Sequence, residues 1–361
     1  MSSKKLTYKQ RVLLNVSKLW SKRWFRRTVY GFIGIVVIPM LIMFVLGEYY
    51  IISNRHKSMD YGVSFSTGQA KWLVGDDWKN NYLALLNDLH VKRVRLMSYW
   101  DDIEPKQSDF HWEDLDWQMN EAAKRGIKVS LAIGARQPRW PECHIPKWVG
   151  EQGSPEFDLA LTRFLRMTVE RYKDNPSLES YQLENKYFLK IFSAECKDYR
   201  RSRLVDEFNL VRQLDPKHQI IVTLSNNFLG SPVQKPTPDK YGFSIYKKVF
   251  LDRWGFNMYI EYPIPAWYYG FRAWFLETTK HRPVIVHELQ AEPWGPTGIK
   301  EMSIDEQDKS MNAGRFKDRM KYIRGTGIKT IDLWGGEWWY YRKTVLHDPS
   351  VWDAVKAELN R

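Results

Sequence analysis

Residues 91–134, VKRVRLMSYWDDIEPKQSDFHWEDLDWQMNEAAKRGIKVSLAIG, hold a strand, a helix and a second strand in direct succession. The runs 91–97 and 127–134 are short, apolar and rich in β-branched residues, which is typical of buried strands. Between them, residues 112–126 space their apolar side chains for one helix face, and Gly126 supplies a C-terminal stop signal. This succession is the repeating unit of folds with a parallel sheet.

The same alternation of strands and helices continues along the rest of the chain. No Gly-x-Gly-x-x-Gly follows a predicted strand, and eight units in about 300 residues favour a closed (β/α)8 barrel over an open doubly wound sheet. The fifth connection, residues 226–240, is rich in Pro and Gly and short for a helix. The barrel is expected over residues 61–361, without a second domain. The other six predicted strands are 61–66, 179–185, 219–225, 241–246, 283–289 and 328–334.

The N-terminal region predicts a membrane anchor. Residues 1–29 carry nine Lys or Arg and no acidic residue, which leaves only +4 of the net charge of +13 for the rest of the chain. A chain that is basic at one end only is not typical of a nucleic-acid-binding protein. Residues 30–52 are apolar and long enough to cross a bilayer. A buried core helix is disfavoured because this run is apolar all round.

A cleaved signal peptide is the other alternative, and it is disfavoured because no small-residue cleavage pattern follows the apolar run. Positive charge before the span predicts that residues 1–29 form a cytoplasmic tail. Residues 53–60 are then a linker, and the barrel lies outside the membrane. The one Asn-x-Ser sequon, at Asn15, falls on the cytoplasmic side, which favours a bacterial surface protein over a Golgi protein.

The two cysteines, Cys143 and Cys196, follow the third and fourth predicted strands. Neighbouring strands of a barrel end at the same face, so the two residues are expected near each other. Outside the cytoplasm such a pair is typically bridged, which predicts a disulfide. Two unrelated buried thiols are the alternative.

Aromatic and charged side chains gather where the predicted strands end, which is where (β/α)8 barrels carry their functional residues. Trp and Tyr faces beside carboxylates and Arg suit a sugar ring, with its apolar face and hydroxyl edges. Core packing is the alternative for any one of them, because 15% of the chain is aromatic. There is no HExxH, CxxC, Gly-x-Ser-x-Gly or phosphate-binding Gly loop, so we expect no metal or cofactor. The substrate-binding candidates from this pattern are Trp100, Arg136, Trp140, Trp294, Glu337 and Trp338.

Five motifs together resemble the cellulase-like retaining glycoside hydrolases of the large (β/α)8 clan. They are YWDDIEP (99–105), DFHWEDLDWQMNEAAKRGIKVSLAIG (109–134), YQLENKYF (181–188), HELQAEPW (287–294) and LWGGEWWYY (333–341). The likeness covers about residues 61–352. It implies a nucleophile at the end of the seventh strand and an acid/base Glu after an Asn at the end of the fourth. The implied roles are nucleophile for Glu288, contact with the sugar 2-hydroxyl for Asn185, support of the nucleophile for Arg95, an aromatic ring near the nucleophile for Tyr246, and a stacking platform for Trp334.

The acid/base position of this pattern holds Lys186. An ordinary Lys has a pKa of about 10.4, so it donates a proton weakly and accepts none while charged. In one interpretation a shifted motif makes Glu184 or Glu195 the acid; in another the site binds carbohydrate without efficient turnover. A third interpretation is an active glycosidase with another proton source, or one interrupted by a single Glu-to-Lys change. The candidate sources are Asp102, Glu104 and Glu337.

The sequence therefore predicts a membrane-anchored, extracytoplasmic protein that acts on or binds an oligo- or polysaccharide. Any turnover would be of the retaining type. The lipid bilayer is the other expected partner, through residues 30–52, and nucleic acid is not expected. A scaffold whose aromatic rim binds a protein or peptidoglycan is the alternative function.

Overall fold

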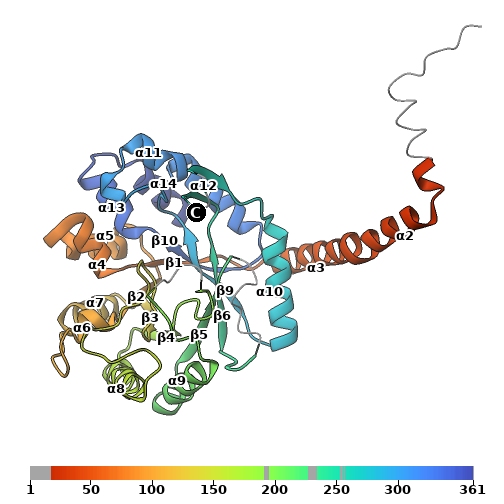
Figure 1. The fold of residues 1–361 in the computed structure, drawn as a ribbon. Helices are drawn as coiled ribbons and strands as arrows, with labels where there is room; N and C mark the ends of the chain where they lie inside the picture. Colours follow the sequence, from red (N-terminus) through yellow and green to blue (C-terminus); the bar gives the residue numbers. More distant parts are fainter. Residues whose placement is uncertain (1–17, 191–194, 227–233, 253–254, 256, 361) are drawn as a thin grey trace, which may run out of the picture.

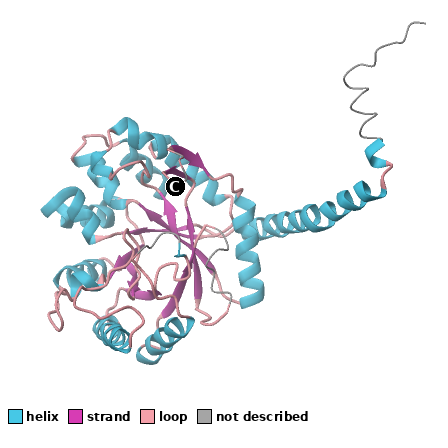
Figure 2. Ribbon diagram, in the orientation of Figure 1, coloured by secondary structure: helices cyan, strands magenta, loops and turns pink. Residues whose placement is uncertain are grey.

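The computed structural model of this chain describes residues 18–190, 195–226, 234–252, 255 and 257–360. Eight parallel strands form a closed barrel, which confirms the predicted fold class. The strands gather at the centre of the molecule and helices surround them (Figure 2). In barrel order the strands are β1 (Asp60–Ser64), β2 (Arg93–Met97), β3 (Lys128–Ile133), β4 (Leu178–Leu183), β5 (Gln219–Leu224), β6 (Lys240–Ile245), β9 (Val284–Gln290) and β10 (Thr330–Trp334), which pairs with β1.

The helices cover the outside of the barrel and bury the outward side chains of the strands. Helix α8 shows why they start where they do: the Ser154 hydroxyl caps the N–H of Phe157 at 3.1 Å, and Pro155 occupies the first turn. The helices of eight or more residues around the barrel are α4 (Thr67–Val74), α5 (Trp78–Asp88), α7 (Glu113–Lys124), α8 (Pro155–Tyr172), α9 (Arg201–Leu214), α10 (Ala266–Lys280), α12 (Ala313–Arg324), α13 (Gly336–Thr344) and α14 (Ser350–Leu359). Shorter helices are α6 (Trp100–Ile103), η2 (Gly75–Asp77), η4 (Ile299–Glu301) and α11 (Ile304–Ser310).

Two connections depart from the simple repeat. Among the described residues between β5 and β6 there is no helix, as the Pro and Gly content predicts, and residues 227–233 lie outside the described part. The long sixth connection forms an antiparallel hairpin, β7 (Lys248–Leu251) with β8 (Met258–Glu261), before α10 begins.

The barrel interior is polar, and its charges are paired. Arg93 binds Asp332 at 2.7 Å, and His287 Nδ1 contacts the same carboxylate. Burial and the nearby Arg95 guanidinium lower the pKa of His287 to about 4, so this imidazole is neutral at pH 7. Arg93, His287 and Asp332 lie deeper in the barrel than the strand ends, and they support the side chains at its mouth.

The N-terminal segment is one long helix, formed by α2 (Arg23–Phe32), the π-helical turn η1 (Ile33–Val37) and α3 (Ile38–Asn54). Residues 23–54 have a mean hydropathy of 2.7 in their most apolar window, so by length and composition they can cross a membrane or act as a signal sequence. Figure 1 shows the helix extending away from the barrel past α10. Because α3 ends at Asn54 and β1 begins at Asp60, the expected linker 53–60 overlaps the last turn of the helix.

Candidate active site

Glu288 and Lys186 meet at the mouth of the barrel. Glu288 is on β9, Lys186 follows β4, and the Lys186 Nζ lies 3.0 Å from Glu288 Oε2 although 102 residues separate them in the chain. The two positions implied by the resemblance are therefore in direct contact.

A register shift in β9 aims two consecutive side chains inward. Val286 and Glu288 of β9 pair with Phe243 and Ser244, which are consecutive in β6, so β9 carries one extra residue here. Successive side chains of a regular strand point to opposite faces, and a bulge breaks that alternation. Both His287 and Glu288 consequently contact residues inside the barrel. This feature was not predicted from the sequence.

Glu288 is a buried carboxylate held by donors on both oxygens. The Arg95 guanidinium lies 3.3 Å from Oε1, while the hydroxyls of Tyr246 and Ser244 donate to Oε2 at 3.1 and 3.2 Å. Burial opposes ionisation, but Lys186 and then Arg95 outweigh it and lower the pKa of Glu288 to about 2. The carboxylate is therefore ionised at neutral pH, as a nucleophile must be.

Lys186 has a second carboxylate partner, Glu142, at 3.2 Å. The Arg136 guanidinium binds Glu142 at 2.6 Å, and the Asn185 amide donates to it at 3.3 Å. Burial disfavours the ammonium, yet Glu142 and Glu288 together raise the pKa of Lys186 above its usual value. The Lys186 ammonium therefore lies between the Glu142 and Glu288 carboxylates and pairs with both.

Glu142 was not predicted from the sequence, although its neighbour Cys143 is the signal that could have pointed to it. The structure joins Cys143 to Cys196 in a disulfide with a Cα–Cα distance of 5.6 Å. The bridge connects the loop after β3 with the loop after β4, where Lys186 lies. It therefore holds Glu142 beside the end of the fourth strand.

Trp334 belongs to a second network at the same mouth. Its indole Nε1 donates to Glu292 at 2.8 Å, and Arg139 binds Glu292 at 2.5 Å and Glu337 at 3.2 Å. A Cβ on Gly335, whose φ is 140°, would lie 2.8 Å from the Ala291 carbonyl oxygen, so glycine is needed for this close approach. The Arg139 guanidinium lies 4.2 Å from the centre of the Trp334 ring and covers one face, so the indole is only 5% exposed.

Two predicted aromatic residues offer open surface near the mouth. Trp140, next to Arg139, is 70% exposed, and Trp294 is 38% exposed. Trp294 packs edge-on against Tyr246 with ring centres 5.5 Å apart. Apolar faces are therefore available beside the carboxylates.

Two of the predicted platforms are core residues, and the expectation that they face a sugar is wrong. Trp100 begins α6, is fully buried, and stacks on Phe164 of α8 at 5.4 Å. Trp338 is also fully buried, and its indole donates to Gln307 at 2.7 Å. In both cases the residue lies in the helix that follows the strand, and the helical backbone directs its side chain into the outer layer of helices.

Arg136 and three of the candidate proton donors do not interact with Glu288. Arg136 donates to the carbonyls of Lys186 and Leu189 at 2.9 and 2.8 Å, which secures the loop after β4. Glu184 accepts from the backbone of Ala135 and Arg136 and binds Arg203 on α9 at 3.3 Å, so it does not face Glu288. Glu104 binds the Trp100 indole, and Glu195 is exposed.

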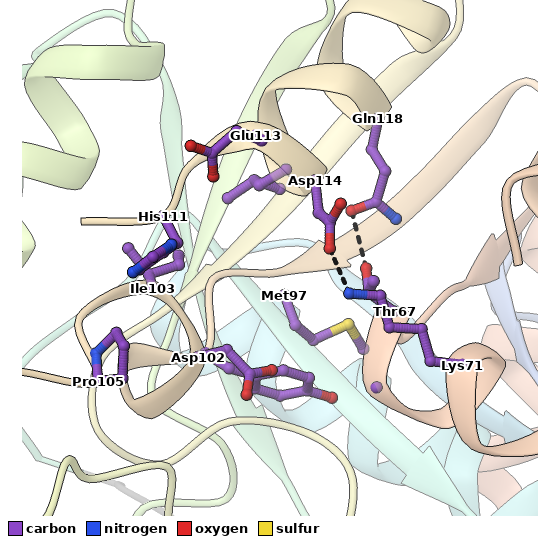
Figure 3. Close-up of a pocket in the computed structure, with 13 residues that line it drawn as sticks. Thr67, Lys71, Met97, Asp102, Ile103, Pro105, His111, Glu113, Asp114 and Gln118 are labelled. Atoms are coloured by element: carbon purple, nitrogen blue, oxygen red, sulfur yellow. Dashed lines mark hydrogen bonds and ion pairs between the residues drawn. The ribbon is translucent and has the colours of Figure 1, made fainter. Parts of the chain in front are cut away.

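Asp102 lines a separate cavity of about 640 Å³ beside the mouth (Figure 3). Lys71 and Asp114 form a 2.5 Å ion pair there, and Thr67 donates to Gln118 at 3.0 Å. Burial and then Asp101 raise the pKa of Asp102. Neither Glu288 nor Lys186 lines this cavity. Within the described ranges no group of three or more His, Cys, Asp or Glu is arranged to hold a metal ion.

Comparison with known proteins places this chain beside enzymes that act on carbohydrates. The model of glycoside hydrolase family 42, described as beta-galactosidase, matches residues 71–157. A beta-galactosidase from the Antarctic haloarchaeon Halorubrum lacusprofundi has a similar structure, with 15% identity and a TM-score of 0.50 over 76% of this chain and 52% of that one.

Two other solved structures are also similar. A GH5_18 protein from Streptomyces cattleya, solved in complex with GlcNAc, has 14% identity and a TM-score of 0.53 over 77% of this chain and 70% of that one. A cold-adapted beta-galactosidase from Rahnella sp. has 12% identity and a TM-score of 0.56 over 84% of this chain and 56% of that one. At such identities the likeness shows the fold alone, a (β/α)8 barrel. This chain spans about half the length of the two beta-galactosidases.

Proposed function

We propose that the protein is a membrane-anchored, extracytoplasmic glycoside hydrolase-like barrel that binds an oligo- or polysaccharide at the ends of its strands. The family match and the carbohydrate-active neighbours support a carbohydrate ligand. The exposed indoles of Trp140 and Trp294 supply stacking faces, and the buried Glu288 carboxylate supplies a hydrogen-bond acceptor. In this proposal those faces lie against the sugar, with Asn185 and Tyr246 at its hydroxyl edge.

The proposal that hydrolysis is slow depends on one observation. The Lys186 ammonium lies 3.0 Å from Glu288 and 3.2 Å from Glu142. Hydrolysis with retention requires Glu288 to attack the anomeric carbon while a second group protonates the departing oxygen. The same second group must then take a proton from the water that releases the sugar. An ammonium between two carboxylates gives up its proton reluctantly and accepts none, so hydrolysis is slow while binding survives.

Glu142 supports a second candidate function, an active retaining glycosidase. Its carboxylate pairs with the same Lys186 ammonium as Glu288, which brings a second carboxylate to the mouth of the barrel beside the nucleophile position. In this alternative Lys186 moves aside when the substrate enters, Glu142 takes up a proton from solvent water, and it passes that proton to the departing oxygen. Glu142→Gln abolishes turnover under this alternative, whereas under the main proposal it does not lower the slow rate.

The membrane anchor is part of the same proposal. Residues 23–54 form an apolar helix whose most hydrophobic window is entirely unburied, and basic residues precede it. The excess of Lys and Arg before the span supports a cytoplasmic N-terminus with the barrel outside, at a bacterial surface. The Cys143–Cys196 bridge agrees with an oxidising location.

A glycan array and an aryl-glycoside panel, both probed with the full-length protein in nanodiscs, test the proposal. We expect binding to at least one glycan, reduced by Trp294→Ala. Trp72→Ala is the matched control, because Trp72 has a similar exposed fraction (42% against 38%) but lies on α4. Binding of the unsubstituted protein to no glycan would favour the scaffold alternative.

A further inference from the structure

The C-terminal part of the apolar helix, in α3, packs directly on the barrel. Gly47 of α3 lies against the backbone of α10, and a Cβ there would overlap the Trp267 carbonyl. A Cβ on Gly270 would come within 3.0 Å of the Gly47 carbonyl oxygen, so glycine on both helices permits the close contact. One turn later, the Tyr50 hydroxyl donates to Glu277 at 2.9 Å.

The length of the helix fixes where this contact lies relative to a bilayer. A membrane core of about 30 Å takes about 20 helical residues. Arg27 is the last basic residue before the apolar run, so counting from it brings the far edge of the core to about Gly47. The ring of Phe44 packs edge-on against Trp267 at 5.6 Å, one turn inside that edge. The N-terminal part of α10 therefore meets the helix at the membrane surface.

The side of α10 that surrounds this contact is aromatic. Trp267, Phe271, Trp274 and Phe275 are all half-buried, and the Phe271 ring stacks on Trp274 with centres 6.2 Å apart. Their spacing puts them on one helix face, where Trp274 and Phe275 also pack partly against the core, while the fully buried side of α10 carries Tyr269, Arg272, Ala273 and Leu276. Tryptophan and other amphipathic rings are enriched at membrane–water interfaces.

We propose that α10 is a second, in-plane contact with the outer leaflet, made through this aromatic face. The proposal depends on the membrane anchoring proposed above. It gives the barrel a fixed orientation on the bilayer instead of a free one. Because α10 precedes β9, which carries Glu288, and follows β6, which ends one residue before Tyr246, this contact would bring the site close to the membrane side of the barrel. Figure 1 shows α3 reaching α10 there.

Photolabelling tests this contact in the full-length protein. Nanodiscs containing a phosphatidylcholine with a diazirine in its acyl chain are irradiated, and lipid adducts are mapped by peptide mass spectrometry. We expect adducts on residues 30–46 and also on residues 266–280. Helix α8 is the internal control, because it lies away from α10 (Figure 1) and carries an exposed apolar side chain, Leu159, at 73%, so it should remain unlabelled.

Glycine substitutions supply a matched pair. Gly47→Leu should reduce the adducts on α10, whereas Gly34→Leu should leave them unchanged because a Cβ at Gly34 meets nothing within 4 Å. Adducts on residues 30–46 without any on α10 would overturn this inference and leave the anchoring intact. Adducts on neither segment would overturn the anchoring itself, and equal labelling of α8 and α10 would overturn the specific contact. The unsubstituted protein decides between these outcomes even if Gly47→Leu fails to fold.

Discussion

Replacing Lys186 by Glu should restore glycoside hydrolysis. The Lys186 Nζ lies 3.0 Å from Glu288 and 3.2 Å from Glu142, so a carboxyl group on this side chain would enter the same site. Positioned proton transfer of this kind is typically worth about 10²–10⁴-fold in rate. The rate of cleavage of a responsive aryl glycoside should rise by a factor in this range.

The electrostatics of the site favour the restored acid. Two neighbouring carboxylates raise the pKa of a third, so the new group keeps its proton near neutral pH. Removal of the ammonium lets the pKa of Glu288 rise from about 2, but Arg95 remains 3.3 Å away and keeps it ionised. The nucleophile and the acid are then in the protonation states that retention requires.

Lys186→Gln is the matched control for this experiment. It removes the same ammonium and has nearly the same shape as Lys186→Glu, but it cannot transfer a proton. Initial rates with an aryl glycoside panel should show a gain for Lys186→Glu alone. Equal rates for the two variants would refute the assignment of position 186 to proton transfer.

Three further predictions concern the disulfide, acid stability and the buried tryptophans. Non-reducing peptide mapping should recover Cys143 linked to Cys196, and reduction should cost about 4 kcal/mol for a loop of 53 residues; two free thiols would contradict this. Because the pKa of Glu288 is lowered from 4.5 to about 2, it contributes roughly 3 kcal/mol above about pH 4.5, which is lost as the pH falls toward 2. Urea unfolding at a series of pH values should show this loss, and Glu288→Gln should flatten it; an unchanged slope would contradict the ion pair. Trp100→Ala should lower the free energy of unfolding by about 3–5 kcal/mol and Trp140→Ala by less than about 0.5. Equal effects in thermal or urea unfolding would contradict their assignment to core and surface.

The barrel and the pairing of positions 186 and 288 were predictable because they depend on strand periodicity. A parallel strand buried on both faces leaves a recognisable apolar run, and eight such runs leave few topologies open. The ends of the fourth and seventh strands then meet at one mouth of the barrel. No knowledge of individual loops was needed.

Features that depend on the exact backbone path were not predictable. Trp100 and Trp338 follow strand ends as closely as Trp334 does, but the chain has already entered α6 and α13, so their indoles point into the helical layer. The contact of Glu142 with Lys186 depends on how the loop after β3 folds back. The bulge in β9 and the packing of α3 on α10 leave no mark in the apolar pattern of the sequence, so that pattern could not predict them.

The role of Glu288 as nucleophile can be tested by covalent labelling with a fluorinated glycosyl substrate analogue. Such an analogue is attacked by the nucleophile of a retaining glycosidase and leaves a slowly hydrolysed glycosyl ester on it. The Lys186→Glu variant should carry this ester on Glu288, and peptide mapping should find it there. An ester on Glu292 would contradict the central claim that the carboxylate at the end of β9 faces position 186 across the barrel mouth as the nucleophile.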